Sequence, residues 1–348
     1  MSGIANDSHD PAPDRRGAAH CSWRRTFGDV DEQAVCLDSL YPQRYQQLGP
    51  GRFRGEMIRI DLDGVIVVRE RVNRRLLQTG SMRTPSIGWL VESEGRFRFN
   101  RQELEPQTAI FYRQGSEFEI QAAPSDLIGI AVIPERLAGG ASLPESLCNE
   151  SLSEGVRRLP LGLFVRLQHA AQRALALFGA DAPLVDAARC EALQFELIDL
   201  MGRVAELPRA GEPHRHGRAR TFERAVRAAQ QEIAADLAGA VSIDGLCRRI
   251  GVSRRNLFYA FDELLGLSPH RYRHALRLNA VRRAIKAEPR GEAAIADLAW
   301  RVGFAHPSRF AADYRRLFGE RPSETLRRTR SLDPRRIAAV WRSFHSRA

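Results

Sequence analysis

The hydrophobic and polar positions divide the chain into a region of short apolar runs and later regions of helical period. Between Phe53 and Ile133, the runs are separated by turn residues such as Asp and Gly. They are MIRI at 57–60, VIVV at 65–68, SIGWL at 86–90, RFRF at 96–99, TAIFY at 108–112, EFEI at 117–120 and LIGIAVI at 127–133. Many short strands at regular spacing are typical of an antiparallel sandwich or barrel, which can enclose a small ligand. We therefore predict an α+β multidomain protein that begins with such a β domain.

A helical period follows at 144–203. Apolar residues three or four apart share one face in each of two segments: Leu163, Leu167, Ala170, Ala174 and Phe178, and then Leu193, Leu197 and Leu200. We predict a helical pair at about 144–203, which completes a sensor domain at 26–205. The pair either packs on its own domain or offers a self-complementary face to a second copy. The polar segments 1–25 and 206–218 are expected to be a disordered tail and a linker.

The last third of the chain contains a quasi-repeat. LCRRIGV at 246–252 aligns with LAWRVGF at 298–304, and LFYAFDELLGLSP at 257–269 aligns with FAADYRRLFGERP at 310–322. Each unit has a short helix ending at a glycine, and then a second helix with apolar residues four apart, as in a helix-turn-helix. We predict an all-α tandem helix-turn-helix domain at 219–330, joined by a helix from Pro269 to about Ala287. A basic tail is expected at 331–348.

The apolar pairs of the two second helices determine which residues face outward. Burial of Leu257 and Phe261, and of Phe310 and Tyr314, leaves the opposite stripes free to enter major grooves of DNA. The residues predicted to read bases are Arg255, Asn256, Phe258, Tyr259, Ser308, Arg309, Ala312 and Arg316. The residues predicted to contact phosphate groups are Arg254, His306, Arg315, Arg271, Arg273 and Arg277. Ser253 and Ser308 are the expected N-caps of the two helices.

The charge distribution favours a nucleic-acid partner for the helical domain alone. The whole chain carries a net charge of +11. Residues 1–217 hold 26 Arg against 29 Asp and Glu, whereas residues 218–330 hold 23 Arg and Lys against 12 Asp and Glu. Clustered cations bind a polyanion by releasing its condensed counterions. Double-stranded DNA is therefore the expected partner of the last third of the chain.

Other classes of protein are disfavoured by composition. The longest apolar runs, such as Leu127 to Ile133, are far shorter than the ~18 residues of a membrane-spanning helix. The first twenty residues contain no apolar segment, so we expect a cytoplasmic protein without a membrane partner. The five cysteines form no C-x-x-C pair, and no third ligand lies near His270 and His274. We expect no metal site, no disulfide framework and no cofactor.

The segment AIADLAWRVGFAHPSRFAADYRRLFGERPSETLRR at 294–328 resembles the second helix-turn-helix of AraC/XylS-type transcriptional regulators. Its matching signature residues are Gly303, Phe304, Phe310, Phe318, Gly319 and Pro322. The strand-rich region and the segment at 45–64 are similar to the sensor domains of the branch that includes ethanolamine-operon regulators. The resemblance implies a transcriptional regulator whose cupin-like N-terminal domain senses a small molecule and dimerises. It also implies that the C-terminal domain binds promoter DNA.

The expected partners are double-stranded DNA, a small-molecule effector and a second copy of the chain, with RNA polymerase as a further candidate. Effector-binding candidates are aromatic and basic residues on the predicted strands, namely Trp89, Arg98, Phe111 and Arg113. The alternative interpretation is that these aromatic rings belong to the core and that the arginines are solvated.

Two alternative functions are kept beside the regulator. A cupin-type enzyme would need inward metal ligands, yet residues 53–133 contain no histidine, so we expect no enzyme. An architectural DNA-binding protein without an effector would use its β domain for dimerisation alone.

Overall fold

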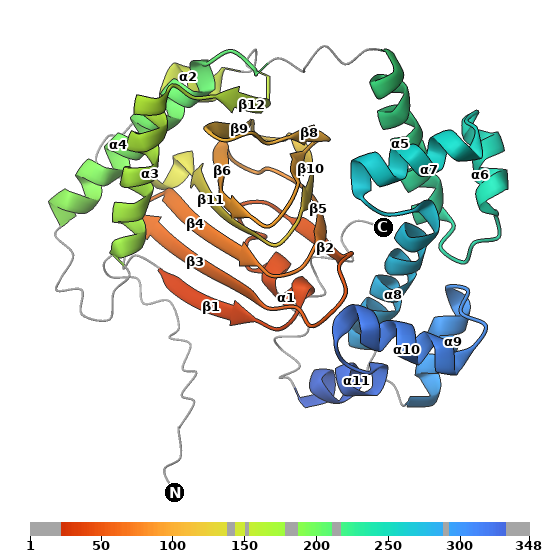
Figure 1. Cartoon of the computed structure of the whole chain (residues 1–348). Helices are drawn as coiled ribbons and strands as arrows, with labels where there is room; N and C mark the ends of the chain where they lie inside the picture. The colour runs from red at the N-terminus through yellow and green to blue at the C-terminus, as the bar shows by residue number, and fades with distance from the viewer. Residues whose placement is uncertain are drawn as a thin grey trace, which may run out of the picture.

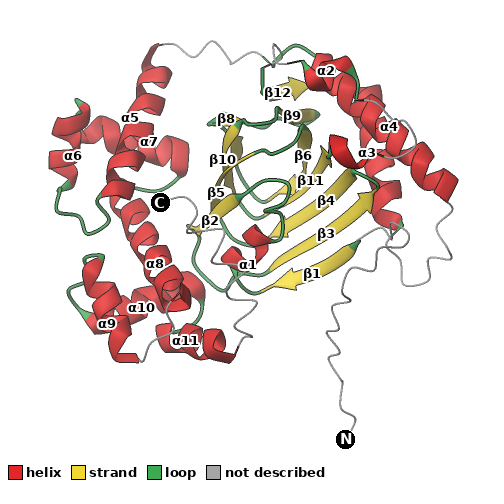
Figure 2. Ribbon diagram, turned by 180° about the vertical axis from the view of Figure 1, so that it is seen from behind, coloured by secondary structure: helices red, strands yellow, loops and turns green. Residues whose placement is uncertain are grey.

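The computed structural model describes residues 22–137, 143–149, 153–177, 187–210, 217–287 and 292–331. Two antiparallel sheets form the first part of the chain and a group of helices forms the last part. Helices α2, α3 and α4 lie along one side of the sheets, and α5 to α11 lie along the opposite side (Figures 1 and 2). The predicted fold class, a β-rich N-terminal domain followed by an all-α tandem helix-turn-helix domain, is confirmed.

The larger sheet has seven strands in the order β1, β3, β4, β11, β6, β9, β12, and the smaller has five in the order β2, β5, β10, β7, β8. The larger sheet comprises Trp23–Phe27 (β1), Gly55–Leu62 (β3), Val65–Val72 (β4), Ser125–Val132 (β11), Ser86–Ser93 (β6), Thr108–Tyr112 (β9) and Gly155–Arg158 (β12). The smaller comprises Gln43–Gln47 (β2), Leu76–Ser81 (β5), Glu117–Ala122 (β10), Phe97–Phe99 (β7) and Gln102–Glu103 (β8).

The remaining secondary-structure elements are helices. Those associated with the sheets are Val30–Val35 (α1), Glu145–Cys148 (α2), Leu161–Ala176 (α3) and Ala187–Glu206 (α4), with a 3-10 turn at Pro134–Arg136. The last part of the chain contains Gly217–Ala235 (α5), Ile243–Ile250 (α6), Arg254–Leu265 (α7), Pro269–Ala287 (α8), Glu292–Arg301 (α9), Pro307–Phe318 (α10) and Pro322–Ser331 (α11).

The larger sheet is apolar on both faces, and this explains the continuous run VIVV in β4. Val65 and Val67 pack in one cluster with α3 and α4, whereas Ile66 and Val68 pack in a second cluster with Tyr45 of the smaller sheet. Because successive side chains point to opposite faces, a strand covered on both sides needs apolar residues at every position. The larger sheet is therefore a middle layer between the helical pair α3 and α4 and the smaller sheet.

The apolar runs correctly located seven strands, β3, β4, β6, β7, β9, β10 and β11, but missed five others and α1. The missed strands β2 (QRYQQ) and β5 (LLQTGS) bury polar side chains, including Gln47 and Gln78. Strand β12 lies inside the region predicted as a helical pair and adds to the edge of the larger sheet at β9. These segments lack the apolar alternation on which the strand prediction relied.

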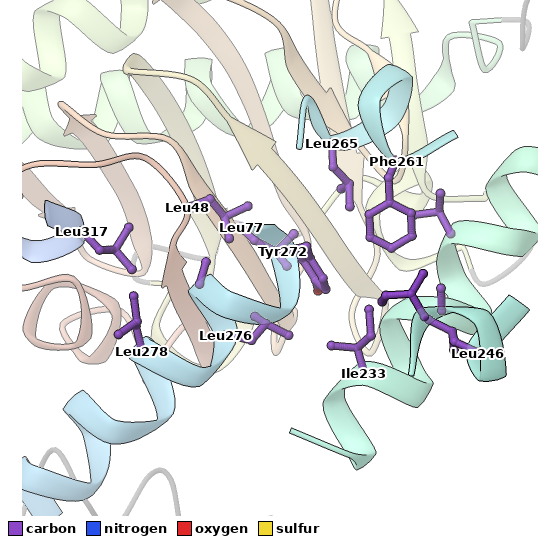
Figure 3. Packing of buried hydrophobic residues seen from close by; sticks show 14 of the residues in the cluster. Leu48, Leu77, Ile233, Leu246, Phe261, Leu265, Tyr272, Leu276, Leu278 and Leu317 are labelled. Atoms are coloured by element: carbon purple, nitrogen blue, oxygen red, sulfur yellow. The ribbon is translucent and has the colours of Figure 1, made fainter. Parts of the chain in front are cut away.

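The core of the helical part also receives side chains from the sheets. Leu48 and Leu77 lie in the same buried cluster as Tyr272, Leu276 and Leu317 (Figure 3). The two parts of the chain therefore share one continuous apolar interface. None of the described helices combines the length and apolar character needed to cross a membrane.

Candidate nucleic-acid interface

Helix α7, the second helix of the first helix-turn-helix unit, is defined by a cap at each end. The Ser253 hydroxyl accepts a hydrogen bond from the amide of Asn256 at 3.2 Å, as the predicted N-cap should. Gly266 ends the helix with φ +62°, a left-handed conformation that favours glycine. Leu257 and Phe261 are fully buried, as their spacing predicts. Their burial turns the opposite stripe of α7 to solvent.

Helix α10, the second helix of the second unit, starts differently from the prediction. His306 is its N-cap and makes no side-chain cap bond, and Pro307 is the first helical residue. The prediction that Ser308 caps α10 is therefore wrong: the N-cap lies two residues earlier, at His306, and Pro307 at the first helical position needs no amide partner there. The hydroxyl groups of Tyr314 and Thr325 lie 2.8 Å apart, and burial raises the pKa of Tyr314 to about 12.

The predicted base-reading residues lie on accessible surface, with one exception. Exposed side chains are those of Arg255, Asn256, Tyr259, Ser308, Arg309, Ala312 and Arg316. Phe258 is half-buried, with the guanidinium carbon of Arg254 5.2 Å from its ring centroid and the His270 ring at 5.7 Å. Phe258 thus supports neighbouring side chains at the edge of the exposed stripe.

The predicted phosphate contacts divide into two groups. Arg254, Arg271, His306 and Arg315 are exposed. Arg273 and Arg277 instead hold the loop between α5 and α6: Nη1 of Arg273 donates to the carbonyl oxygen of Val241 at 2.9 Å, and Arg277 donates from Nε and Nη2 to loop carbonyls at 2.5 and 2.7 Å. Their geometry therefore suits loop positioning better than an open phosphate contact.

Helix α8 sets the separation of the two helix-turn-helix units. It has 19 residues, which corresponds to about 28 Å at 1.5 Å per residue. Successive major grooves on one face of B-DNA repeat about every 34 Å. The length of α8 is thus of the same order as this repeat.

The N-terminal part of the chain supplies hydrogen-bond donors to the carboxyl ends of both α7 and α10. Arg98 of β7 donates from Nη1 to the carbonyl oxygens of Glu263 and Leu264 in α7, at 2.6 and 2.5 Å. In α10, the amide of Gly51 donates to the carbonyl oxygens of Arg316 and Leu317 at 2.9 and 3.1 Å. Terminal carbonyls of a helix lack partners within the helix, so these contacts satisfy groups that would otherwise need solvent.

A buried ion cluster joins the same two parts of the chain. Asp29, the N-cap of α1, contacts Arg282 of α8 at 2.9 Å, Arg328 of α11 at 3.1 Å and the ammonium of Lys286. Lys286 also contacts Asp31 at 2.7 Å. Burial alone would raise the pKa of Asp29, but the charges of Lys286, Arg282 and Arg328 outweigh it and hold the pKa far below its usual range.

Sequence reasoning missed this interface. Asp29 lies outside every helix and strand that the sequence predicts. Arg98 is predicted to bind an effector, whereas in the structure it donates hydrogen bonds to α7. One signal is present in the sequence: Lys286 is the only lysine among 53 basic residues. The ammonium group of Lys286 contacts both Asp29 and Asp31. An ammonium is a compact charge, whereas the guanidinium of arginine is larger and planar, so lysine and arginine are not interchangeable at this position.

The predicted effector residues do not meet at one cavity. Trp89 and Phe111 are 0% and 1% exposed in the cluster beneath α3 and α4, Arg98 contacts α7, and Arg113 is half-buried beside the turn that follows β9. Trp89 and Phe111 thus lie on the face of their strands that the helices cover. Tyr112, which follows Phe111, points to the opposite face and lines a cavity between the sheets.

That cavity has a volume of about 40 Å³ and is bordered by Tyr41, Glu70, Tyr112 and Phe118 among other residues. Among the described residues, no three His, Cys, Asp or Glu side chains gather in a metal-binding arrangement. The described residues that line this cavity include one acidic side chain, Glu70, and no histidine, cysteine or aspartate.

Comparison with known proteins gives matches over both parts of the chain. A helix-turn-helix domain family matches residues 246–328. A probable thc operon regulatory protein of Rhodococcus erythropolis is 28% identical over 327 residues, which cover 86% of this chain and 93% of that protein. The XylDLEGF operon transcriptional activator 3 of Pseudomonas putida is 34% identical over 116 residues, 33% of this chain and 34% of that protein.

Solved structures also match. A probable AraC family transcriptional regulator from Rhodopseudomonas palustris CGA009 is 33% identical, with a TM-score of 0.28, over 30% of this chain and 96% of that chain. The chain thus spans nearly the full length of one curated relative and about a third of another.

Proposed function

Since the chain belongs to the AraC/XylS-type transcriptional regulators, we propose that it reads one DNA site with α7 and α10 in successive major grooves, under the control of a small molecule bound in the β domain. The observation that carries this proposal is the exposure of Arg255 and Arg309 in the first turns of two recognition helices joined by α8. Arginine at the start of a recognition helix can donate two hydrogen bonds to guanine.

Specific binding is tested by selecting sites for the full-length chain from random duplex DNA. We expect one site in which two recognised segments lie about 10 base pairs apart. Affinity should fall steeply as salt is raised, because exposed arginines release counterions from the DNA. Recovery of unrelated sequences with no shared segment would contradict the proposal.

Dimerisation through the helical pair is a further part of the proposal. Leu161 and Val165 of α3 and Phe195 of α4 are 61%, 37% and 44% exposed. Exposed apolar side chains favour an interface between copies. We expect sedimentation of the full chain to show a dimer that Phe195→Glu weakens, whereas Val91→Glu, at the exposed Val91 of β6, leaves it intact. A monomer at micromolar concentration would argue against this part.

RNA polymerase is the further partner that we propose, because transcription is the process that a promoter-bound regulator controls. The proposal contains no catalytic step. It differs from an effector-free architectural protein in one measurable respect: a small molecule should raise the melting temperature of the regulator.

A further inference from the structure

The cavity between the two sheets contains one charged side chain. Among the described residues that line it, Glu70 of β4 is the single charged group, and the others are apolar or neutral polar, including Gln43 and Gln78. Glu70 is 6% exposed. Its strand neighbours on either side, Met57 of β3 and Leu127 of β11, are apolar.

The hydrogen bonds of Glu70 involve one of its two carboxylate oxygens. Nε2 of Gln33 donates to Oε1 at 2.7 Å, and the hydroxyl of Tyr45 donates to the same oxygen. No described residue donates to Oε2, and no described cation forms an ion pair with Glu70. One carboxylate oxygen is thus left for an occupant of the cavity.

A buried carboxylate without a cation is energetically unfavourable. Desolvation disfavours the charged form, and it raises the pKa of Glu70 despite the hydrogen bonds from Tyr45 and Gln33. Removing an uncompensated ion from water is unfavourable, and a paired cation offsets part of that desolvation penalty. An anion would add repulsion, and a neutral polyol would leave the charge uncompensated.

Aromatic rings complete the environment of a cation. Tyr41, Tyr112 and Phe118 line the cavity, and the ring of Phe118 lies 6.3 Å from that of Tyr41 and 5.9 Å from that of Tyr112. The faces of such rings attract ammonium groups when water is excluded. A metal ion is a poorer fit, because a single carboxylate cannot supply its ligand set.

The size of the cavity limits the ligand. A volume of 40 Å³ corresponds to roughly three or four water positions at about 10–15 Å³ each. The occupant should therefore have only a few heavy atoms.

We propose that this cavity binds a small organic ammonium ion, whose nitrogen pairs with Glu70 and whose carbon chain lies against Tyr41, Tyr112 and Phe118. This assignment rests on the proposed effector control and names the chemical class of the effector.

Helix α1 connects this carboxylate to the DNA-binding part of the chain. Gln33, which donates to Glu70, lies on α1 together with Asp31, and Asp29 caps the same helix. Asp29 and Asp31 contact Lys286 of α8. A shift of Gln33 upon ligand binding thus acts on the short helix that holds α8, which gives ligand binding a direct route to the recognition helices.

The test uses the full-length chain and three probes of similar size: n-propylammonium, 1-propanol and propionate. At pH 8, calorimetric titration should show binding of n-propylammonium alone, and the same ion should raise the melting temperature. Glu70→Gln keeps the shape and the acceptor for Tyr45 but removes the charge. Glu70→Gln should lower the affinity for n-propylammonium at least tenfold. Glu105→Gln, at a side chain 65% exposed, should leave that affinity unchanged.

The pH dependence gives a second measurement that needs no variant. The groups that face Glu70 are Tyr41, Tyr45 and Tyr112, whose pKa values burial raises, and the neutral Gln33. Glu70 is thus the carboxylic acid among these groups, and its protonation competes with binding of the ammonium. Affinity for n-propylammonium should rise with pH and level off above the pKa of Glu70.

Three results would overturn the proposal: equal binding of propanol or propionate, unchanged affinity in Glu70→Gln, or no ammonium binding to the wild-type chain. The selection of DNA sites from random duplexes uses no ligand. Failure of DNA recognition and failure of ammonium recognition are therefore separate outcomes.

Discussion

Asn279 of α8 and Gln47 of β2 exchange two hydrogen bonds across the boundary between the helices and the sheets. The amide of Gln47 donates to Oδ1 of Asn279 at 3.0 Å, and Nδ2 of Asn279 donates to the carbonyl oxygen of Gln47 at 2.9 Å. Strand β2 is an edge strand, so its outer main-chain groups have no strand partner. The side chain of Asn279 takes the place of that partner and fixes α8 to the sheet.

Loss of the Asn279 side chain should destabilise the whole chain. Asn279→Ala leaves the buried amide and carbonyl of Gln47 without partners, at a cost of about 1–3 kcal/mol each when unsatisfied. Urea unfolding should show a lower free energy of unfolding, with a smaller change for the exposed Asn256→Ala. Equal stability of the two variants would show that water replaces Asn279 at the edge strand.

Asp29→Asn should cost about 3–5 kcal/mol at pH 7, because it leaves three cations around a neutral group in a buried site. Asp199→Asn removes an exposed pair with Arg203, whose side chains are 50% and 54% exposed, and should cost below about 1 kcal/mol. Chemical denaturation of both variants against the wild type measures the difference.

The contribution of Asp29 also has a defined pH dependence. Its folded-state pKa lies below the unfolded value of about 3.9, so the stabilisation is complete above that value and declines as the pH falls towards the folded-state pKa. The stability difference between wild type and Asp29→Asn should therefore narrow below about pH 4. A stability difference between the two proteins that stays constant from pH 7 to pH 2.5 would contradict a stabilising role of the charged Asp29 in the ion cluster.

Arg309→Ala and Arg315→Ala should affect DNA binding in different ways. If Arg309 reads a base, its replacement should cost about 1–3 kcal/mol and relax sequence choice at one base pair. If Arg315 binds a phosphate group, its replacement should weaken binding to all sequences about equally. It should also reduce the slope of log affinity against log salt concentration by about one. Binding of both variants to a panel of single-base-pair changes distinguishes the two roles.

Gly319→Ala should be more damaging than Gly251→Ala, although both glycines have φ +70°. The left-handed conformation costs alanine about 1–2 kcal/mol at either position. At Gly251, a Cβ would meet nothing within 4 Å, whereas at Gly319 it would lie 2.7 Å from the amide nitrogen of Arg52. The loop that carries Arg52 would have to move, which should lower the free energy of unfolding by about 1–3 kcal/mol more than in Gly251→Ala. Thermal or urea unfolding measures this difference.

Glu70→Gln should alter the pH dependence of stability in the opposite sense from Asp29→Asn. The folded-state pKa of Glu70 is raised, so the folded chain binds more protons than the unfolded chain above about pH 4.3. Wild-type stability should decrease as the pH rises through this window, and the glutamine variant should lack that decrease. Parallel stability curves for the two proteins would show that Glu70 titrates normally.

Local patterns were sufficient for the helix-turn-helix units but only partly for the sheets. Leu257, Phe261, Phe310 and Tyr314 are buried as their four-residue spacing predicts, because a helix repeats its contacts within one or two turns. Trp89 and Phe111 show the limit of the same reasoning in strands. Alternation separates the two faces of a strand, but it does not tell which face the helices α3 and α4 cover.

The amino-acid sequence by itself determined the tandem repeat, the excess of basic residues in the last third of the chain and most of the central strands, since these follow from composition and from neighbours close in the chain. Only the tertiary structure decided that Asp29 meets Lys286, that Gln47 meets Asn279, and that Glu70 borders a cavity without a cation among its described lining residues. The physical reason is that the partners in these contacts are far apart in the chain and are brought together by the packing of the sheets on α8. The local pattern of apolar and polar residues contains no information about contacts of this kind.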